Sequence, residues 1–157
     1  RHTHDMIRFS EEFALNIPSR RLLNHTQYFG VVSGREIQKV EAAKIPTFRG
    51  RKVEAPLLEG CVGYIECGLE DVLRFGDHNL FVGRVVAVSA EKEAFGETWL
   101  LEDDDDKPLH YLGLDYYAIL SERTQAHLRT TEAGGLRVEE GEEEEESQND
   151  EEEEETG

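Results

Sequence analysis

The segment CVGYIECGLEDVLRF (61–75), followed by GDHN (76–79) and LFVGRVVAVSAE (80–91), decides the fold. Apolar residues alternate with polar ones over residues 64–73, which is the period of a β-strand. The third segment is rich in β-branched side chains and has a glycine at its middle, a composition that favours a second strand. GDHN has the residues of a tight turn. We therefore expect a β-hairpin over residues 61–91.

The residues before this hairpin favour helices. Thr3 and Ser19 each stand where a side chain can cap a helix start. Ser33 and Glu36 have the spacing of a capping box. The predicted elements are a helix over residues 3–13, a short buried strand over 14–19 ended by Pro18, a helix over 19–30, a helix over 35–44 and an irregular connector over 45–60.

The residues after the hairpin favour one more strand and then no regular structure. Residues 98–109 contain a run of aspartates, which indicates a solvated loop. Residues 110–120 are rich in aromatic side chains and predict a third strand of a meander. Periodicity disappears after about Gln125. Helices followed by an antiparallel sheet indicate an α+β or barrel-type domain and not a doubly wound sheet.

The acidic residues of the chain gather at its end. The net charge is −18, and residues 132–157 hold 14 acidic residues against one basic residue, Arg137. Such a segment cannot bury apolar area, so we expect residues 126–157 to be a disordered acidic tail. Its role in solubility, in binding a basic partner, or in neither stays open.

Composition also excludes several classes of protein. No stretch approaches the roughly 20 apolar residues of a membrane span, no signal-peptide pattern is present, and no basic tract favours nucleic acid. His2, His4 and His25 lack the spacing of a metal site. Cys61 and Cys67 form neither a disulfide framework nor a metal pair, and we expect them to pack as small apolar residues. We therefore expect a cytoplasmic protein with no metal, no membrane partner and no nucleic-acid partner.

Five segments, in unbroken order, resemble one family. They are RHTHDMIRFSEEFALNIPS (1–19), YFGVVSGREIQKVEAAKIPT (28–47), APLLEGCVGYIEC (55–67), GDHNLFVGRVVAVSAE (76–91) and KPLHYLGLDYYAIL (107–120). Together they resemble the flavin reductase-like family of FMN-binding split barrels, in its flavoredoxin-like branch. The resemblance covers roughly residues 1–120.

The resemblance implies a fold that is mainly β with helices (α+β), a split β-barrel of Greek-key type. It implies a split-barrel domain over residues 1–125, and a chain that lacks the family's N-terminal strands. The chain departs from the family's pattern in three features. It lacks those strands, it has the acidic tail, and it has Val40 where the family usually has an aromatic residue after the lysine.

The resemblance further implies bound FMN and hydride transfer from NADH or NADPH to flavin in a homodimer. Because the hydride moves directly to the flavin, we expect no catalytic acid or base. Two other functions stay open. One is a flavoredoxin-like FMN electron carrier without useful NAD(P)H oxidation, and the other is a flavin-free split-barrel binding module.

Arg1, Thr3, Ser33 and Lys39 match family positions near the FMN phosphate. An ammonium group and a helix start would bind that dianion. Three of the four residues also have a plainer interpretation. Lys39 would be a solvated surface lysine, Thr3 a simple cap, and Arg1 an unordered chain end.

His78 is the candidate for the nicotinamide or substrate side, because a neutral imidazole beside a flavin can hydrogen-bond a ligand. The alternative is a plain turn residue, since Gly76 and Asp77 favour chain reversal by themselves. Tyr111, Tyr116 and Tyr117 are interpreted mainly as core aromatics, with flavin stacking or a dimer contact as the alternative.

Overall fold

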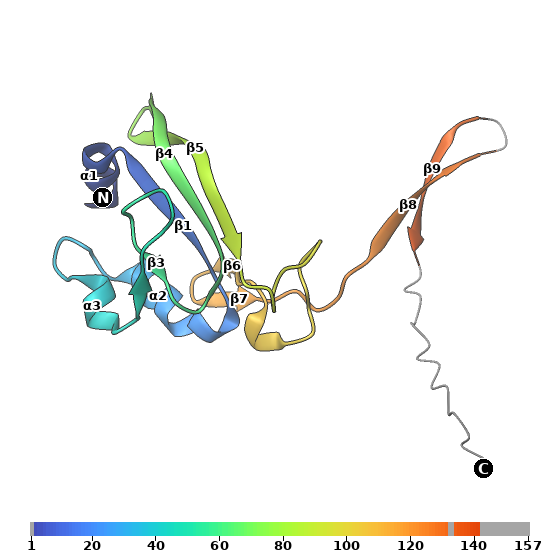
Figure 1. Cartoon of the computed structure of the whole chain (residues 1–157), viewed down its shortest axis with the longest axis horizontal. Helices are drawn as coiled ribbons and strands as arrows, with labels where there is room; N and C mark the ends of the chain where they lie inside the picture. Colours follow the sequence, from blue (N-terminus) through green and yellow to red (C-terminus); the bar gives the residue numbers. More distant parts are fainter. Residues whose placement is uncertain (1, 132–133, 142–157) are drawn as a thin grey trace, which may run out of the picture. The chain divides into compact units, whose positions relative to one another are not determined.

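The computed structural model describes residues 2–131 and 134–141 (Figure 1). The chain divides after Ser121 into two compact units. The first unit contains α1 (His2–Ser10), β1 (Glu12–Pro18), η1 (Arg20–Leu22), α2 (Leu23–Val31), α3 (Lys39–Ala43), β2 (Thr47–Phe48), β3 (Leu57–Leu58), β4 (Cys61–Phe75), β5 (His78–Ala90), η2 (Asp104–Asp106), β6 (His110–Gly113) and β7 (Tyr116–Ala118).

A three-stranded antiparallel sheet in the order β1-β4-β5 forms the centre of this unit (Figure 1). β4 and β5 are 15 and 13 residues long, and they form the predicted hairpin. The turn is tighter than the predicted four residues, because Phe75 already pairs with His78. Gly76 takes a φ of +59°, a conformation that glycine adopts without the strain of a side chain.

The third strand of the sheet precedes the hairpin in the chain and does not follow it. The predicted helix over 3–13 ends at Ser10, and Glu11 has a φ of +58°. Phe13 then lies in β1, opposite Cys67 of β4. Sheet pairing has therefore overridden the helical spacing of the apolar residues. The predicted meander is wrong at its other end too, because β6 and β7 pair with each other.

Two predicted helix starts are also wrong in detail. The Ser19 hydroxyl makes no cap and instead donates to the Gly60 carbonyl, at 3.0 Å. The Ser33 hydroxyl accepts from the backbone N–H of Arg35 inside a turn, at 3.3 Å. The following helix, α3, begins only at Lys39. The contact of Ser19 is long-range in sequence, and the contact of Ser33 lies within a turn. Each of them competes with helix capping.

The core brings β1, β3 and β4 together with side chains from η1, α2 and α3. Its buried members are Leu22, Ile45, Leu57, Cys61 and Tyr64. The Tyr64 hydroxyl is satisfied inside this core, because it donates to the carbonyl oxygens of Leu58 and Cys61, both at 3.0 Å. The connector over 45–60 contributes two short paired strands, β2 and β3, to this packing.

A buried carboxylate ties the connector to the sheet. Glu66 of β4 is only 2% exposed and accepts from the backbone N–H groups of Arg51, Lys52 and Val53, at 3.0, 2.7 and 3.0 Å. A methyl group on Gly50 would lie 2.5 Å from this carboxylate. The absence of a side chain at Gly50 therefore lets the loop close around Glu66.

Cys61 and Cys67 are free thiols and are both buried, in agreement with the interpretation as small apolar residues. Burial raises the pKa of the Cys61 thiol to about 11 and also raises the pKa of Cys67. We therefore expect both thiols of the native protein to react slowly with an aromatic disulfide reagent at about pH 8, because little thiolate forms and access is poor. The same reagent in denaturant should titrate both thiols rapidly. Fast titration of the native protein would contradict the buried placement.

The second unit contains β8 (Gln125–Thr130) and β9 (Leu136–Gly141), which form an antiparallel hairpin. The expectation of no regular structure beyond Gln125 is wrong for these residues. Most of the predicted acidic tail, residues 142–157, lies outside the described residues, and the domain boundary at residue 125 stays a prediction. No helix in the described part of the chain is long and apolar enough to span a membrane.

Candidate functional site

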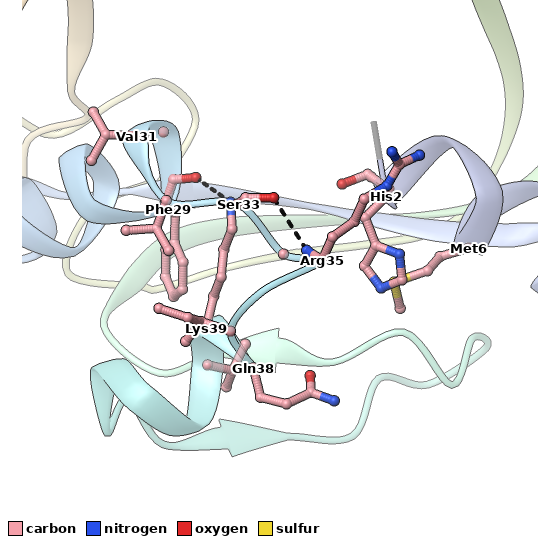
Figure 2. A pocket seen from close by; sticks show the side chains of 14 residues that line it. His2, Met6, Phe29, Val31, Ser33, Arg35, Gln38 and Lys39 are labelled. Atoms are coloured by element: carbon pink, nitrogen blue, oxygen red, sulfur yellow. Dashed lines mark hydrogen bonds between the residues drawn. The ribbon is translucent and has the colours of Figure 1, made fainter.

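A cavity of about 690 Å³ opens between α1, the end of α2 and the start of α3 (Figure 2). Its walls are His2, Thr3 and Met6 of α1, residues 29–35, and residues 37–40. In Figure 2, Arg35 lies on the side of His2 and Met6, and Lys39 extends along the opposite wall. The volume is in the range of small-molecule and cofactor sites.

Three of the sequence-predicted phosphate residues meet at this cavity. Thr3, Ser33 and Lys39 come from α1, the turn after α2 and the start of α3, and all three line the cavity. Arg1 lies outside the described residues. The shared cavity brings these side chains together, and their binding of phosphate stays a prediction.

Lys39 is not a fully solvated surface lysine. Its ammonium group is part-buried and donates to the backbone carbonyl of Phe29, at 2.6 Å (Figure 2). Phe29 lies in the last turn of α2, where carbonyl groups lack helical partners and carry partial negative charge. The lysine therefore stabilises the end of α2 while its charge borders the cavity.

Arg35 is a cavity residue that sequence reasoning missed. It stands between Ser33 and Glu36, the two residues whose spacing predicts a capping box. Its Nη2 lies 3.4 Å from Oδ2 of Asp5 in the first turn of α1. A hydrogen bond from His4, and then the charge and hydrogen bond of Arg35, hold the pKa of Asp5 below its ordinary value. Asp5 is thus ionised at neutral pH.

His78 lies apart from this cavity. It is the first residue of β5, at the tip of the hairpin, and its side chain is 85% exposed. Its Nδ1 lies 2.7 Å from Oδ1 of Asp77. The next residue, Asn79, contacts His4 of α1, so the hairpin tip and α1 are joined beside His78. A role of His78 on the nicotinamide side stays a prediction.

The tyrosines differ from their main interpretation as core residues. Tyr111 and Tyr116 are exposed on the β6–β7 hairpin. Only Tyr117 is partly buried, and its hydroxyl donates to Oε1 of Gln27, at 2.8 Å. A short hairpin can turn one side chain inward while its neighbours face solvent, which aromatic composition alone does not reveal.

Two smaller cavities have a different chemistry. One, of about 400 Å³, has acidic side chains from Glu59, Glu91 and Glu93 on its wall. Burial, with the nearby acidic groups, raises the pKa of Tyr64 there to about 12. The other, of about 130 Å³, is mostly apolar and borders His25. In the described part of the chain, no three His, Cys, Asp or Glu residues gather as a metal site.

The chemistry of the cavity between α1, α2 and α3 favours an anion. Lys39 and Arg35 bring two cationic groups to it, and Thr3 and Ser33 bring two hydroxyl groups. The first turn of α1 contributes His2 and Thr3 to the same wall. A phosphorylated small molecule fits this set of donors, because charge-assisted hydrogen bonds from lysine and arginine suit phosphate oxygens.

A family model described as "Flavin reductase like domain" matches residues 1–119. The chain belongs to the flavin reductase-like family. This flavin reductase-like chain is 31% identical, over 127 residues, to the uncharacterized protein YddH of Escherichia coli, and the match covers 79% of this chain and 67% of YddH. The chain spans about half the length of three archaeal relatives that it matches, between 43% and 54%.

Solved structures show the same fold. An FMN-binding protein from Thermus thermophilus, solved with bound 1-cyclohex-2-enone, has a TM-score of 0.69 and 33% identity, covering 81% of this chain and 68% of that chain. A flavoredoxin from Methanosarcina acetivorans has a TM-score of 0.68 and 24% identity, covering 85% of this chain and 70% of that chain. The predicted fold, mainly β with helices and of the FMN-binding split-barrel type, is confirmed.

Proposed function

We propose that this flavin reductase-like chain binds FMN in the cavity between α1, α2 and α3, and that it transfers hydride from NADH or NADPH to flavin. The observation that carries the proposal is the meeting of Thr3, Ser33 and Lys39 at one cavity. Membership of the family and the likeness to an FMN-binding protein from Thermus thermophilus support it.

In this proposal the protein binds the phosphate and orients the ring. Lys39 and Arg35 neutralise the phosphate charge, and the hydroxyl groups of Thr3 and Ser33 donate to its oxygens. Arg1, which precedes Thr3 in the chain, would add a third cation. The flavin itself supplies the hydride chemistry, so the function requires no catalytic acid or base from the chain. His78 would border the nicotinamide side.

A homodimer is part of the proposal. Leu15 of β1 pairs with Ile65 of β4, and Ile65 pairs with Val88 of β5, so these side chains form one apolar row across the sheet. Leu15 and Val88 are each more than half exposed in the single chain. An apolar face of this kind is stabilised when a partner covers it. Light scattering during size-exclusion chromatography gives the molar mass in solution, which tests whether the protein is a homodimer.

A cytoplasmic location is also part of the proposal. The free cysteines suit it, because thiols stay reduced in that compartment.

The second candidate function is an FMN electron carrier, which the fold likeness to a flavoredoxin favours. Absorbance of the purified protein after incubation with FMN, followed by NADH and NADPH oxidation with excess free flavin, separates the two functions. Bound FMN with rapid oxidation supports the reductase, whereas bound FMN without oxidation supports the carrier. A protein that binds no FMN would favour the flavin-free binding module.

Lys39 gives a direct test of the phosphate site. We expect Lys39→Gln to weaken FMN binding about tenfold or more, because a charge-assisted hydrogen bond to phosphate is lost. Riboflavin, which has no phosphate, should bind the variant and the wild type alike. Lys39→Arg should retain most of the FMN affinity.

Lys92→Gln is the matched control, because Lys92 is exposed after β5 and does not line the cavity. Fluorescence quenching of each flavin measures the affinities. An equal loss of FMN and riboflavin affinity in Lys39→Gln would show that Lys39 acts only by holding the end of α2.

A further inference from the structure

A chain of four side chains links the cavity to the tip of the β4–β5 hairpin. Arg35 Nη2 lies 3.4 Å from Asp5 Oδ2, and Asp5 Oδ1 lies 3.0 Å from His4 Nδ1. His4 Nε2 in turn lies 2.7 Å from Asn79 Nδ2. Arg35 lines the cavity, whereas His4 and Asp5 of α1 are not among its lining residues. The four residues come from three segments that are distant in sequence.

The donors and acceptors of this chain fit one arrangement. The Asn79 amide nitrogen can only donate, so His4 Nε2 must be the acceptor. His4 Nδ1 then carries the proton and donates to the Asp5 carboxylate, an assignment made from the hydrogen-bond pattern. The His4 ring also packs edge-on against Phe81, with 5.3 Å between ring centroids. Asp5 is thus oriented by a histidine that β5 holds in place.

The contact between Asp5 and Arg35 contributes little to folding. Both side chains are more than 60% exposed, and an exposed ion pair stabilises a protein only slightly. Its larger effect is on the arginine, whose long side chain would otherwise sample many rotamers. The backbone N–H of Arg35 is held as well, by the Ser33 hydroxyl. The guanidinium is therefore restricted at the cavity rim before a ligand binds.

We propose that Asp5 is a positioning residue that holds Arg35 at the rim of the cavity, where Arg35 distinguishes a phosphorylated flavin from an unphosphorylated one. The inference rests on the proposed function. The direction in which Asp5 changes the affinity for phosphate is testable, because the negative charge of Asp5 alone would repel phosphate. A positioning role requires that Asp5 strengthen phosphate binding in spite of that repulsion.

The test compares FMN and riboflavin affinities of the whole chain. We expect Asp5→Asn to weaken FMN binding about three- to tenfold, the effect of one immobilised long side chain, and to leave riboflavin binding unchanged. Arg35→Gln should weaken FMN binding further, and the double variant should match Arg35→Gln alone. Asp115→Asn, an exposed change of the same charge in the turn between β6 and β7, is the control.

Three results would overturn the proposal: tighter or unchanged FMN binding in Asp5→Asn, equal losses for the two flavins, or additive effects in the double variant. If the wild-type chain binds neither flavin, the proposed function fails, and inorganic phosphate then decides the positioning role. NMR of the Arg35 Nε resonance should show a phosphate-dependent shift that is smaller in Asp5→Asn. Equal shifts in the two proteins would contradict the role of Asp5.

Discussion

Replacement of Glu66 by glutamine is expected to lower the Tm by about 5 to 10 °C, because three backbone N–H groups lose a charged acceptor that is itself buried. The carboxylate accepts from Arg51, Lys52 and Val53 and is almost fully buried. A glutamine has one oxygen with which to accept, and its amide nitrogen would face a donor. Circular dichroism during heating measures the change.

Glu70→Gln is the matched control on the same strand. Glu70 forms a two-point ion pair with Arg84, but both side chains are largely exposed. Its replacement should change the Tm by no more than about 2 °C. Equal losses in the two variants would contradict a special role of the buried carboxylate.

The difference in Tm between the wild type and Glu66→Gln is also expected to depend on pH. The N–H donors, that of Arg51 first, hold the pKa of Glu66 below its ordinary value of 4.5. The carboxylate therefore stabilises the fold fully above the ordinary value, and this stability is lost as the pH falls through the lowered value. The Tm gap should be largest near neutral pH and should narrow as the pH falls below the ordinary value of 4.5.

Gly83→Ala is expected to reduce the free energy of unfolding by about 1–3 kcal/mol, because the site has no room for a methyl group. A Cβ at this position of β5 would lie 2.5 Å from Cζ and 2.8 Å from Cε1 of Phe13, and 3.0 Å from Cβ of Cys67. The Phe13 ring, which β1 places over the glycine, would have to move. Denaturant unfolding measures the loss.

Two further variants identify the cause of that loss. Gly68→Ala on β4 is the control, since a methyl group there meets nothing within 4 Å, and it should leave stability unchanged or slightly raised. Phe13→Leu removes the ring atoms that a methyl group at position 83 would meet. The double variant Phe13→Leu, Gly83→Ala should therefore lose less free energy of unfolding than the sum of the losses in the two single variants. Additive losses would show that the contact between Phe13 and Gly83 is not the reason.

Local patterns predicted the candidate site only in part. Thr3, Ser33 and Lys39 were found through family-like segments, and the structure brings them to one cavity. Arg35 was missed because its contact partner, Asp5, is 30 residues away in sequence. No spacing rule relates two such positions, since their meeting depends on where α1 lies.

The sequence by itself determined the β4–β5 hairpin and the family, because alternation, β-branching and the turn residues are all local and agree with one another. Tertiary structure alone decided that Phe13 leaves the predicted helix to pair with Cys67, and that Glu66 closes a loop 13 to 15 residues away. Sheet pairing and buried hydrogen bonds stabilise these arrangements more than local propensity opposes them. Their energies come from partners that no local window of sequence contains.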